Sequence, residues 1–452
     1  MMKRFLYCII LTLFLTDLSA QQIVNRDPVI MEMVQELSAA NIEANVRKLA
    51  SFGTRHTLSD TTSDTRGIGA ARKWVKSQFE LYAKDSDGRL TAEMDYYTIT
   101  ADGRRIPEDA ASANVLGILK GTDPENNQVM LITGHLDSRA SDVMDVAIDA
   151  PGANDDASGV AVILEMARVM SKKAFQATII FMAVTGEEQG LYGATYMAEK
   201  MLADSVNLVA VLNNDMIGNS TSSGTDLHDN TQVRVFSEGV PAYETEEMER
   251  MRRYTSAEND SKSRQLARYI KEVGERYVDQ LEVKLVYRND RFLRGGDHTP
   301  FARKGFTAVR VCEMNENYYR QHQTVRKEEG IQYGDLPEFI DYEYARKNAG
   351  INLATLANLA MAPAAPENVL VDVSGLSNST RLLWEAPKTG KAPKGYYVLM
   401  RETYQPLWQK KFYVEGEEAT LPYSKDNYFF AVQAVDEDGH ESLPVFPVPK
   451  RR

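Results

Sequence analysis

The sequence predicts an α/β fold with a mixed, mostly parallel sheet flanked by helices, followed by a small all-β sandwich. In the first 360 residues, apolar or β-branched runs alternate with segments whose apolar residues recur at helical spacing. This alternation is typical of sheets whose parallel strands are connected by helices. After residue 366 the apolar runs are short and are separated by Pro, Gly and Asp, which favours a sandwich.

Within the α/β part, apolar runs predict the strands and periodic segments predict the helices. Strands are expected at 114–119, 129–133, 178–184, 208–212, 284–287 and 307–311. Helices are expected at 68–82, 158–170, 261–278 and 344–359. A polar stretch at 219–231 and a charged stretch at 243–260 interrupt the alternation, so we expect surface loops or a lid there.

A linker is predicted at residues 361–366, because two prolines in four residues cannot continue the preceding helix. A chain of 452 residues is also long for a single core. We therefore expect one domain over 21–360 and a sandwich over 367–452. Strands of the sandwich are expected at 380–384, 396–401, 409–414 and 428–435.

The C-terminal segment resembles a fibronectin type III module. The resemblance rests on Trp384 before Pro387, on Gly395-Tyr396-Tyr397-Val398, and on Tyr428-Phe429-Phe430-Ala431-Val432 before Asp436, Gly439 and Ser442. It implies a module without disulfides that is a candidate for contact with a surface or polymer.

Residues 1–20 are predicted to be a signal peptide. Lys3 and Arg4 precede an apolar run at 5–16, and small residues follow at 18–20. That run is shorter than the roughly 20 residues of a membrane-spanning helix, and no comparable run follows. We expect an exported protein (periplasmic, cell-surface or extracellular) without a membrane span.

Charge and cysteine content narrow the function further. Lys and Arg total 52 against 64 Asp and Glu, a net charge of −12. Nucleic-acid binding needs a basic surface, so we expect no nucleic-acid partner. Cys8 lies in the predicted signal peptide and leaves Cys312 alone, which excludes an internal disulfide and a Cys-rich zinc motif.

Polar residues follow directly after several predicted strands, where open α/β sheets bind ligands. The strand at 129–133 continues into Gly134-His135-Leu136-Asp137. His135 alone is ordinarily structural. With Asp137 two residues on, however, one ring nitrogen can face outward while the carboxylate holds the other N–H, as in metal sites.

Carboxylates recur at the neighbouring positions. Asp155 and Asp156 open a helix, where an N-cap role explains one Asp and a bound cation better explains the second. Glu187 and Glu188 follow the strand at 178–184, and Asp215 follows the strand at 208–212. Crowded carboxylates repel one another, and a divalent cation reverses that cost.

Mixed histidine and carboxylate ligands suit zinc or a similar transition metal. A second histidine is therefore expected, and His298 and His322 are both candidates that position alone does not separate. His56, His228 and His440 lie in polar loops or in the C-terminal segment and are interpreted as surface residues.

Residues of roughly 40–360 resemble the dizinc aminopeptidase family that includes aminopeptidase Y and secreted bacterial leucyl aminopeptidases, with glutamate carboxypeptidase II and glutaminyl cyclase as more distant relatives. The resemblance rests on five motifs that occur in the family's order. They are Gly134-His135-Leu136-Asp137-Ser138, Pro151-Gly152-Ala153-Asn154-Asp155-Asp156-Ala157-Ser158-Gly159, Gly186-Glu187-Glu188-Gln189-Gly190-Leu191-Tyr192-Gly193, Asn214-Asp215-Met216 and Asp297-His298-Thr299-Pro300-Phe301.

The resemblance implies a zinc exopeptidase fold with two zinc ions per chain, bridged by Asp155. It implies that His135 and Asp215 complete one zinc site and that Glu188 and His322 complete the other. Asp137 would orient His135, Glu187 would be the general base, the Asp155-Asp156 peptide would be cis, and His298 would not be a ligand.

Two departures from the family pattern stand out. The last ligand is usually followed directly by Thr and soon by Asp, whereas Gln323 and Thr324 follow His322. Some relatives place a Tyr shortly before the Asp-His motif to polarise the carbonyl, and residues 292–294 here are Phe, Leu and Arg. Arg294 is then a candidate for that role.

We therefore expect a secreted zinc exopeptidase that hydrolyses N-terminal residues of peptide substrates, since carboxylates can hold a free α-amine. A carboxypeptidase or dipeptidase is the alternative within the fold, favoured by Arg288, Arg291 and Arg294, which can receive a carboxylate. Exposed arginines are the commoner case, so we expect these to be solvated. A non-catalytic adhesion or binding protein is a third interpretation.

Overall fold

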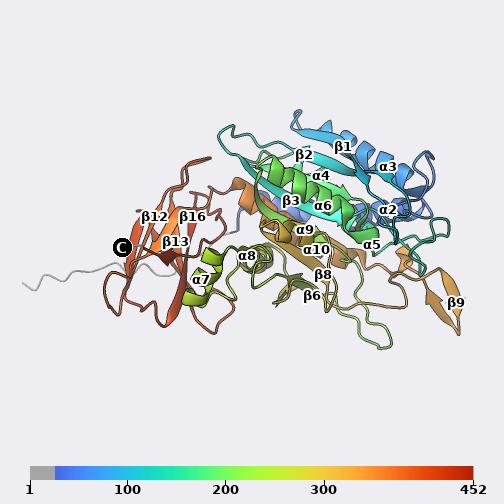
Figure 1. Cartoon of the computed structure of the whole chain (residues 1–452). Helices are drawn as coiled ribbons and strands as arrows, with labels where there is room; N and C mark the ends of the chain where they lie inside the picture. Colours follow the sequence, from blue (N-terminus) through green and yellow to red (C-terminus); the bar gives the residue numbers. More distant parts are fainter. Residues whose placement is uncertain (1–25, 451–452) are drawn as a thin grey trace, which may run out of the picture.

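The structure is a computed structural model that describes residues 26–450. The predicted signal peptide at 1–20 lies outside the described residues. Across 26–450, the main sheet has eight strands in the order β1-β2-β4-β3-β5-β8-β6-β7 (Figure 1). Their bounds are β1 Leu90–Ile99, β2 Ala110–Leu119, β3 Gln128–His135, β4 Thr178–Val184, β5 Asn207–Asn214, β6 Gln232–Phe236, β7 Glu282–Val286 and β8 Ala308–Glu313.

The centre of the main sheet is parallel and its edges are mixed. Strands β4, β3, β5 and β8 run parallel to one another. Strands β1 and β2 add antiparallel strands at one edge, while β6 runs antiparallel to β8 and parallel to β7. The predicted fold class, a mixed and mostly parallel sheet flanked by helices, is confirmed.

Helices cover both faces of this sheet. One face packs against α1 Pro28–Glu36, α2 Ala39–Ala50, α3 Gly67–Ala83, α4 Ala157–Met170, α8 Lys262–Tyr277 and α10 Tyr342–Met361. The other face packs against α6 Tyr192–Ala203 and α9 His298–Arg303. Helix α4 is apolar nearly all round because it lies between β3 and the helices α2 and α10, so its start is held firmly beside the sheet.

The charged stretch at 243–260 was predicted to be a surface loop or a lid. It contains helix α7 Glu246–Thr255. None of the described residues of α7 is buried, so the helix shows little of the apolar pattern that identifies helices in sequence. Capping and ion pairs stabilise it instead: Thr245 accepts a hydrogen bond from Met248 N at 3.2 Å, and Arg252 pairs with Glu244 at 2.8 Å.

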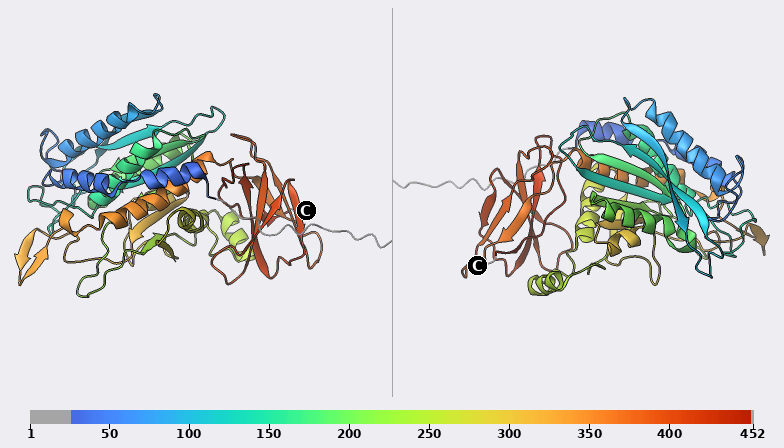
Figure 2. Two further views of the ribbon diagram at one scale, coloured as in Figure 1. Left: turned by 180° about the vertical axis from the view of Figure 1, so that it is seen from behind. Right: turned by 45° about the horizontal axis from the view of Figure 1, so that its top comes forward.

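The C-terminal strands form two small sheets, shown in orange and red at one end of the molecule (Figure 2). Their strands are β11 Glu367–Val371, β12 Thr380–Glu385, β13 Gly395–Glu402, β14 Lys410–Val414, β15 Glu418–Leu421, β16 Tyr428–Val435 and β17 Val448–Pro449. Trp384 and Tyr396, one from each sheet, meet edge to face with ring centroids 5.3 Å apart. The expected C-terminal β-strands are therefore present.

Buried ion pairs connect these sheets to helix α8 and its surroundings. The fully buried carboxylate of Asp260 pairs with Arg268 at 2.8 Å and with Arg401 of β13 at 2.6 Å. Glu441, also buried, pairs with Arg276 of α8 at 3.0 Å. Because each charge is compensated across the contact, the C-terminal sheets are fixed against the main sheet's helices.

His440 is buried, contrary to the prediction that it lies on the surface. Its Nδ1 lies 2.8 Å from Asp436 Oδ2, and its Nε2 lies 2.6 Å from Asp27 Oδ2. Asp27 also caps helix α1. His440 therefore links the C-terminal sheets to the beginning of the described chain.

No helix in residues 26–450 combines the length and the apolar composition that a membrane-spanning helix needs.

Candidate metal centre

The predicted site residues meet at one edge of the main sheet because their strands run parallel. His135 ends β3 beside Val184, the last residue of β4, and Glu187 and Glu188 follow β4 in the short helix α5 Glu187–Gly190. Asp215 follows Asn214, the last residue of β5, the strand on the other side of β3. Parallel neighbours end at the same edge, which brings these side chains together.

Asp155 lies between two histidines. Its Oδ1 is 3.0 Å from His135 Nε2, and its Oδ2 is 2.9 Å from His322 Nε2. His322 Nε2 is also 3.0 Å from Glu188 Oε1. In the described chain, two groups of potential metal ligands adjoin here, each with ligand atoms within 4.8 Å of one another: His135, Glu187 and Asp215, and Asp155, Glu188 and His322.

The structure distinguishes between His298 and His322, the two candidates for the second histidine of the site. His322 reaches the cluster, whereas His298 lies in α9 with its Nε2 2.8 Å from the carbonyl oxygen of Asn289. The peptide between Asp155 and Asp156 is cis, as the family resemblance implied.

Asp137 acts differently from the expected carboxylate–histidine contact. His135 Nδ1 lies 2.9 Å from the main-chain oxygen of Asp137 and 4.0 Å from its carboxylate. That carboxylate instead accepts hydrogen bonds from the backbone N–H groups of Gly186, Glu187 and Glu188, at 2.9, 3.2 and 3.0 Å. Asp137 thus holds both the histidine and the segment that carries the two glutamates.

Asp156 connects the ends of β3 and β5 to the beginning of α4 through backbone hydrogen bonds. Its carboxylate accepts hydrogen bonds from the backbone N–H groups of His135, Gly159 and Met216, at 2.9, 3.0 and 3.2 Å. A Cβ at Gly159 would lie 2.5 Å from Asn214 O, so only glycine permits this close approach. Of the tandem pair, Asp155 faces the histidines and Asp156 fixes the backbone around them.

Asp335, which no sequence motif indicated, holds the Asp155 loop. Its carboxylate accepts hydrogen bonds from Asn154 N at 2.9 Å and Asp155 N at 2.8 Å. The hairpin of β9 Arg326–Glu328 and β10 Ile331–Tyr333 lies between His322 and Asp335. It extends at the end of the molecule opposite the C-terminal sheets (Figure 1). Because the hairpin is inserted there, spacing in the sequence hides the relation between the two residues.

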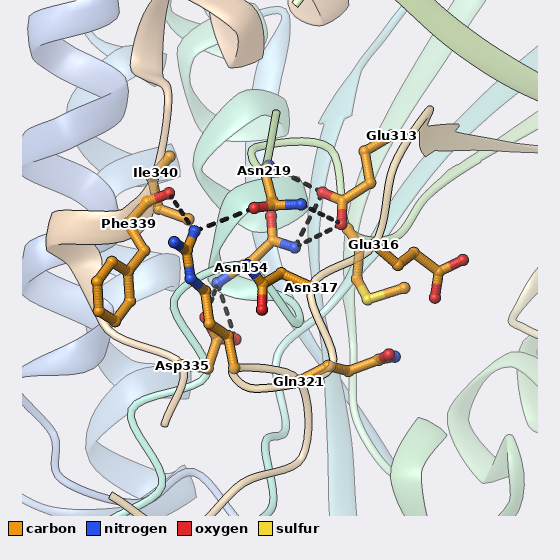
Figure 3. A pocket seen from close by; sticks show the side chains of 11 residues that line it. Asn154, Asn219, Glu313, Glu316, Asn317, Gln321, Asp335, Phe339 and Ile340 are labelled. Carbon is orange, nitrogen blue, oxygen red and sulfur yellow. Dashed lines mark hydrogen bonds between the residues drawn. The ribbon is translucent and has the colours of Figure 1, made fainter. Parts of the chain in front are cut away.

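A buried polar network lies beside Asp335 (Figure 3). Asn154 Nδ2 donates to Glu313 Oε2 at 2.9 Å, and Asn219 N donates to the same carboxylate at 2.8 Å. Asn154 Oδ1 accepts from Gly218 N at 3.0 Å. These bonds fix the side chain of Asn154, the residue before Asp155, while Asp335 holds its backbone N–H.

Arg310 was also missed. It lies fully buried in β8, where its guanidinium pairs with Asp215 at 2.8 Å and with Asp290 at 3.1 Å. A charged residue within an apolar strand is a signal that sequence analysis can use, because a buried arginine needs an acidic partner.

Two histidines outside the cluster were interpreted as surface residues. His56 is fully buried, with its Nε2 2.8 Å from Gln189 Nε2 and 2.9 Å from Val143 O, so that prediction is wrong. The side chain of His228 is 64% exposed, as predicted.

Burial and the close spacing of the carboxylates shift the pKa values of the cluster residues. Burial opposes protonation of His135, but hydrogen bonds to Asp155 and Asp215 outweigh it and raise the pKa of the imidazole well above its ordinary value. Burial lowers the pKa of His322, but the charges of Glu188 and Asp155 outweigh burial and raise this pKa to about 10. Burial raises the pKa of Glu187 well above its ordinary value. The carboxylates thus favour cationic partners, and the mixed imidazole and carboxylate donors suit zinc.

The cluster opens into a pocket of about 540 Å³. Four arginines of the described chain line it together with the proposed ligands: Arg105, Arg139, Arg291 and Arg294. The expectation that the arginines at 288–294 are solvated holds for Arg288 and Arg294, which are exposed. Arg291 is instead mostly buried and pairs with Glu316 at 3.0 Å.

Comparison with known proteins gives a family, close relatives and similar folds. The family model for Peptidase family M28 matches residues 114–342. A probable zinc metalloprotease of Leptosphaeria maculans is 46% identical over 421 residues, which cover 93% of this chain and 97% of the relative. A probable zinc metalloprotease of Pyricularia oryzae is 45% identical, covering 92% of this chain and 83% of the relative.

Solved structures agree on the fold. LapB from Legionella pneumophila aligns with a TM-score of 0.53 and 19% identity, covering 75% of this chain and 76% of LapB. An aminopeptidase from Aneurinibacillus sp. strain AM-1 aligns with a TM-score of 0.51 and 15% identity, covering 72% of this chain and 95% of that enzyme.

Proposed function

Since the chain belongs to peptidase family M28, we propose that it is a zinc-dependent aminopeptidase that holds two zinc ions and removes N-terminal residues from peptides. The observation that carries this proposal is the position of Asp155, whose two carboxylate oxygens face His135 and His322 at 3.0 and 2.9 Å. Relatives named as probable zinc metalloproteases support the same metal.

The side chains present fit two zinc ions. His135 and Asp215 would hold one ion, Glu188 and His322 would hold the other, and Asp155 would be shared between the two sites. Imidazole nitrogen and carboxylate oxygen are ordinary zinc ligands. Bound zinc would supply Lewis acidity, lowering the pKa of a water and polarising the scissile carbonyl.

Glu187 is assigned the role of general base. It begins α5 and its carboxylate lies in the group formed with His135 and Asp215. Asp137 holds its backbone N–H at 3.2 Å. A carboxylate oxygen of Glu187 accepts the proton of the attacking water and then donates it to the leaving amine, which requires a fixed position within hydrogen-bond reach.

The polarity of cleavage is part of the proposal. A free α-amine can donate hydrogen bonds to individual carboxylate oxygens at the pocket, which come from Asp155, Glu187, Glu188 and Asp215. Arg294 at the same pocket favours a carboxypeptidase or dipeptidase as the second candidate, because guanidinium binds carboxylate well. The full ligand set with a base disfavours a purely adhesive protein.

Export and a fibronectin type III-like role for the C-terminal sheets complete the proposal. The predicted signal peptide at 1–20 supports export, and the two C-terminal sheets support a sandwich module that contacts a surface or polymer.

Mass spectrometry of digested peptides tests the polarity. We expect peptides of about ten residues, whose C-terminus lies roughly 30 Å from the N-terminus when extended, to lose residues one at a time from the N-terminus. N-acetylation should protect them and C-terminal amidation should have little effect. Protection by amidation together with cleavage of acetylated peptides would refute the aminopeptidase assignment.

A further inference from the structure

We propose that the pocket beside the metal centre selects substrates with a carboxylate close to the scissile bond, and that Arg294 binds this carboxylate. This inference rests on the proposed peptidase function and names the substrate class of the same site.

Most of the residues that line the pocket carry a charged side chain. Among the described residues that line it, Leu191 is the only one with a large apolar side chain, while Arg105, Arg139, Arg291 and Arg294 contribute guanidinium groups. An apolar substrate side chain gains affinity mainly by contact with apolar walls. This pocket therefore offers little to a leucine-like residue.

The charge balance favours an anionic group. Two divalent cations would carry as much positive charge as the four carboxylates of the pocket carry negative charge. The four arginines would then leave the loaded pocket net positive. A concave site with one excess sign of charge attracts ligands of the other sign.

Three of the four arginines already have partners. Arg139 Nη2 lies 3.1 Å from His322 Nδ1 and its Nε lies 3.6 Å from Glu188 Oε2. Arg291 pairs with Glu316, and Arg105 Nη1 donates to the carbonyl oxygen of Glu188 at 2.6 Å. These contacts position the metal-site segments and the pocket wall.

Arg294 differs from the other three. Its exposed guanidinium has no hydrogen bond, ion pair or ring contact with any residue in 26–450. It can therefore form a bidentate pair with a substrate carboxylate without giving up an existing partner.

The backbone around Arg294 is anchored. Arg294 N donates to Arg291 O at 3.0 Å across a turn in which Leu293 has a φ of 58°. The next residue, Gly295, accepts a hydrogen bond from the buried Arg310 at 3.2 Å. Arg310 also pairs with Asp215. The residue after Arg294 is therefore bound to the same arginine that contacts a proposed zinc ligand.

Arg288 provides a matched control in the same loop. It is exposed, its guanidinium lies 5.4 Å from the ring centroid of Phe292, and it does not line the pocket. Replacing it changes the net charge of the loop as much as replacing Arg294 does.

The carboxylate can come from an acidic side chain or from the C-terminus of a very short peptide. Three matched pairs separate these sources: Glu-Ala-Ala-amide with Gln-Ala-Ala-amide, Ala-Glu-Ala-amide with Ala-Gln-Ala-amide, and Ala-Ala with Ala-Ala-amide. The kcat/KM of each peptide is measured on the zinc-loaded full chain and on Arg294→Ala, Arg294→Lys and Arg288→Ala.

We expect the carboxylate member of at least one pair to have a kcat/KM about tenfold or more above its neutral partner, as one charge-assisted contact gives. Arg294→Ala should abolish that preference, Arg294→Lys should retain part of it, and Arg288→Ala should keep it. Calorimetric titration of the same pair into the Glu187→Gln variant should show the same preference as a difference in Kd.

Equal hydrolysis of all pairs by the wild type, or an acidic preference that survives Arg294→Ala, would overturn the inference and leave the peptidase function intact. If no peptide is cleaved, the proposed function fails. The calorimetric titration then tests the inference without hydrolysis. A lower Kd for the carboxylate member of a pair would support it, and equal Kd values within each pair would overturn it.

Discussion

The carboxylate of Asp335 accepts a hydrogen bond from the backbone N–H of Asp155 at 2.8 Å, across 180 residues of sequence. It also accepts from Asn154 N at 2.9 Å. Asp155 is the side chain shared by the two proposed zinc sites, so its position depends on a residue that contacts no metal in this proposal. The candidate metal centre and the segment after the β9–β10 hairpin are therefore one structural unit.

Asp335 should determine metal affinity without being a ligand. Asp335→Ala removes the acceptor of two buried N–H groups, which loosens the loop of Asp155. We expect zinc affinity to fall roughly 10- to 100-fold, the usual effect of residues that support ligands. Competition with a chromogenic chelator measures this. Asp226→Asn, an exposed aspartate, should leave the affinity unchanged, and unchanged affinity in Asp335→Ala would contradict the supporting role.

Metal content should be about two zinc ions per active chain. A chelator should abolish peptide hydrolysis, and added zinc or cobalt should restore it, because activity requires metal ions bound at the site. Atomic absorption and activity measured on the same samples check this. Full peptidase activity with one ion per chain would contradict the shared role of Asp155.

Substitutions of the adjacent Glu187 and Glu188 should have different effects on kcat and on metal content. Glu187→Gln removes the base but no ligand, so we expect two bound ions and a loss of about 10² to 10⁴ in kcat. Glu188→Gln should instead reduce metal content, since its carboxylate lies 3.0 Å from His322 Nε2. Metal analysis beside steady-state kinetics distinguishes the two, and a Glu187→Gln variant with near-normal kcat would rule out the assigned base.

Contacts between the C-terminal sheets and α8 should stabilise the whole chain. Arg401→Met removes a partner of the fully buried Asp260 and should lower the free energy of unfolding by on the order of 2 kcal/mol. Urea denaturation measures this. Arg381→Met removes an exposed guanidinium that pairs with Glu418 at 2.6 Å and with Asp372 at 3.8 Å, and it should cost less than about 1 kcal/mol. Equal effects of the two changes would show that the buried contact contributes little.

His440 should make stability depend on pH. Burial lowers the pKa of its imidazole, but hydrogen bonds to Asp436 and Asp27 outweigh burial and raise it above the ordinary 6.5. Lys391, 3.5 Å from Asp436, is the nearby cation. The stabilisation is therefore complete below pH 6.5 and is lost as the pH rises through the folded-state pKa. Denaturation of wild type and His440→Gln should differ more at about pH 6 than at about pH 9, and a constant difference would refute this.

Much of the candidate metal centre was predictable from local sequence. His135, Glu187, Glu188 and Asp215 each follow an apolar strand, and parallel strands end at one edge of a sheet. A short apolar run followed by carboxylates is therefore enough to predict which side chains gather there. The fold class was predictable for the same reason, because strand and helix periods are local properties of the chain.

Tertiary structure alone decided the rest. Position alone left His298 and His322 equivalent, the family resemblance favoured His322, and the packing of the chain shows that His322 reaches Asp155 while His298 contacts Asn289. Asp335, His56 and His440 are ordinary polar residues by sequence, and each has a partner far along the chain. A buried hydrogen bond between distant residues depends on how whole elements pack, and a local pattern carries no record of that packing.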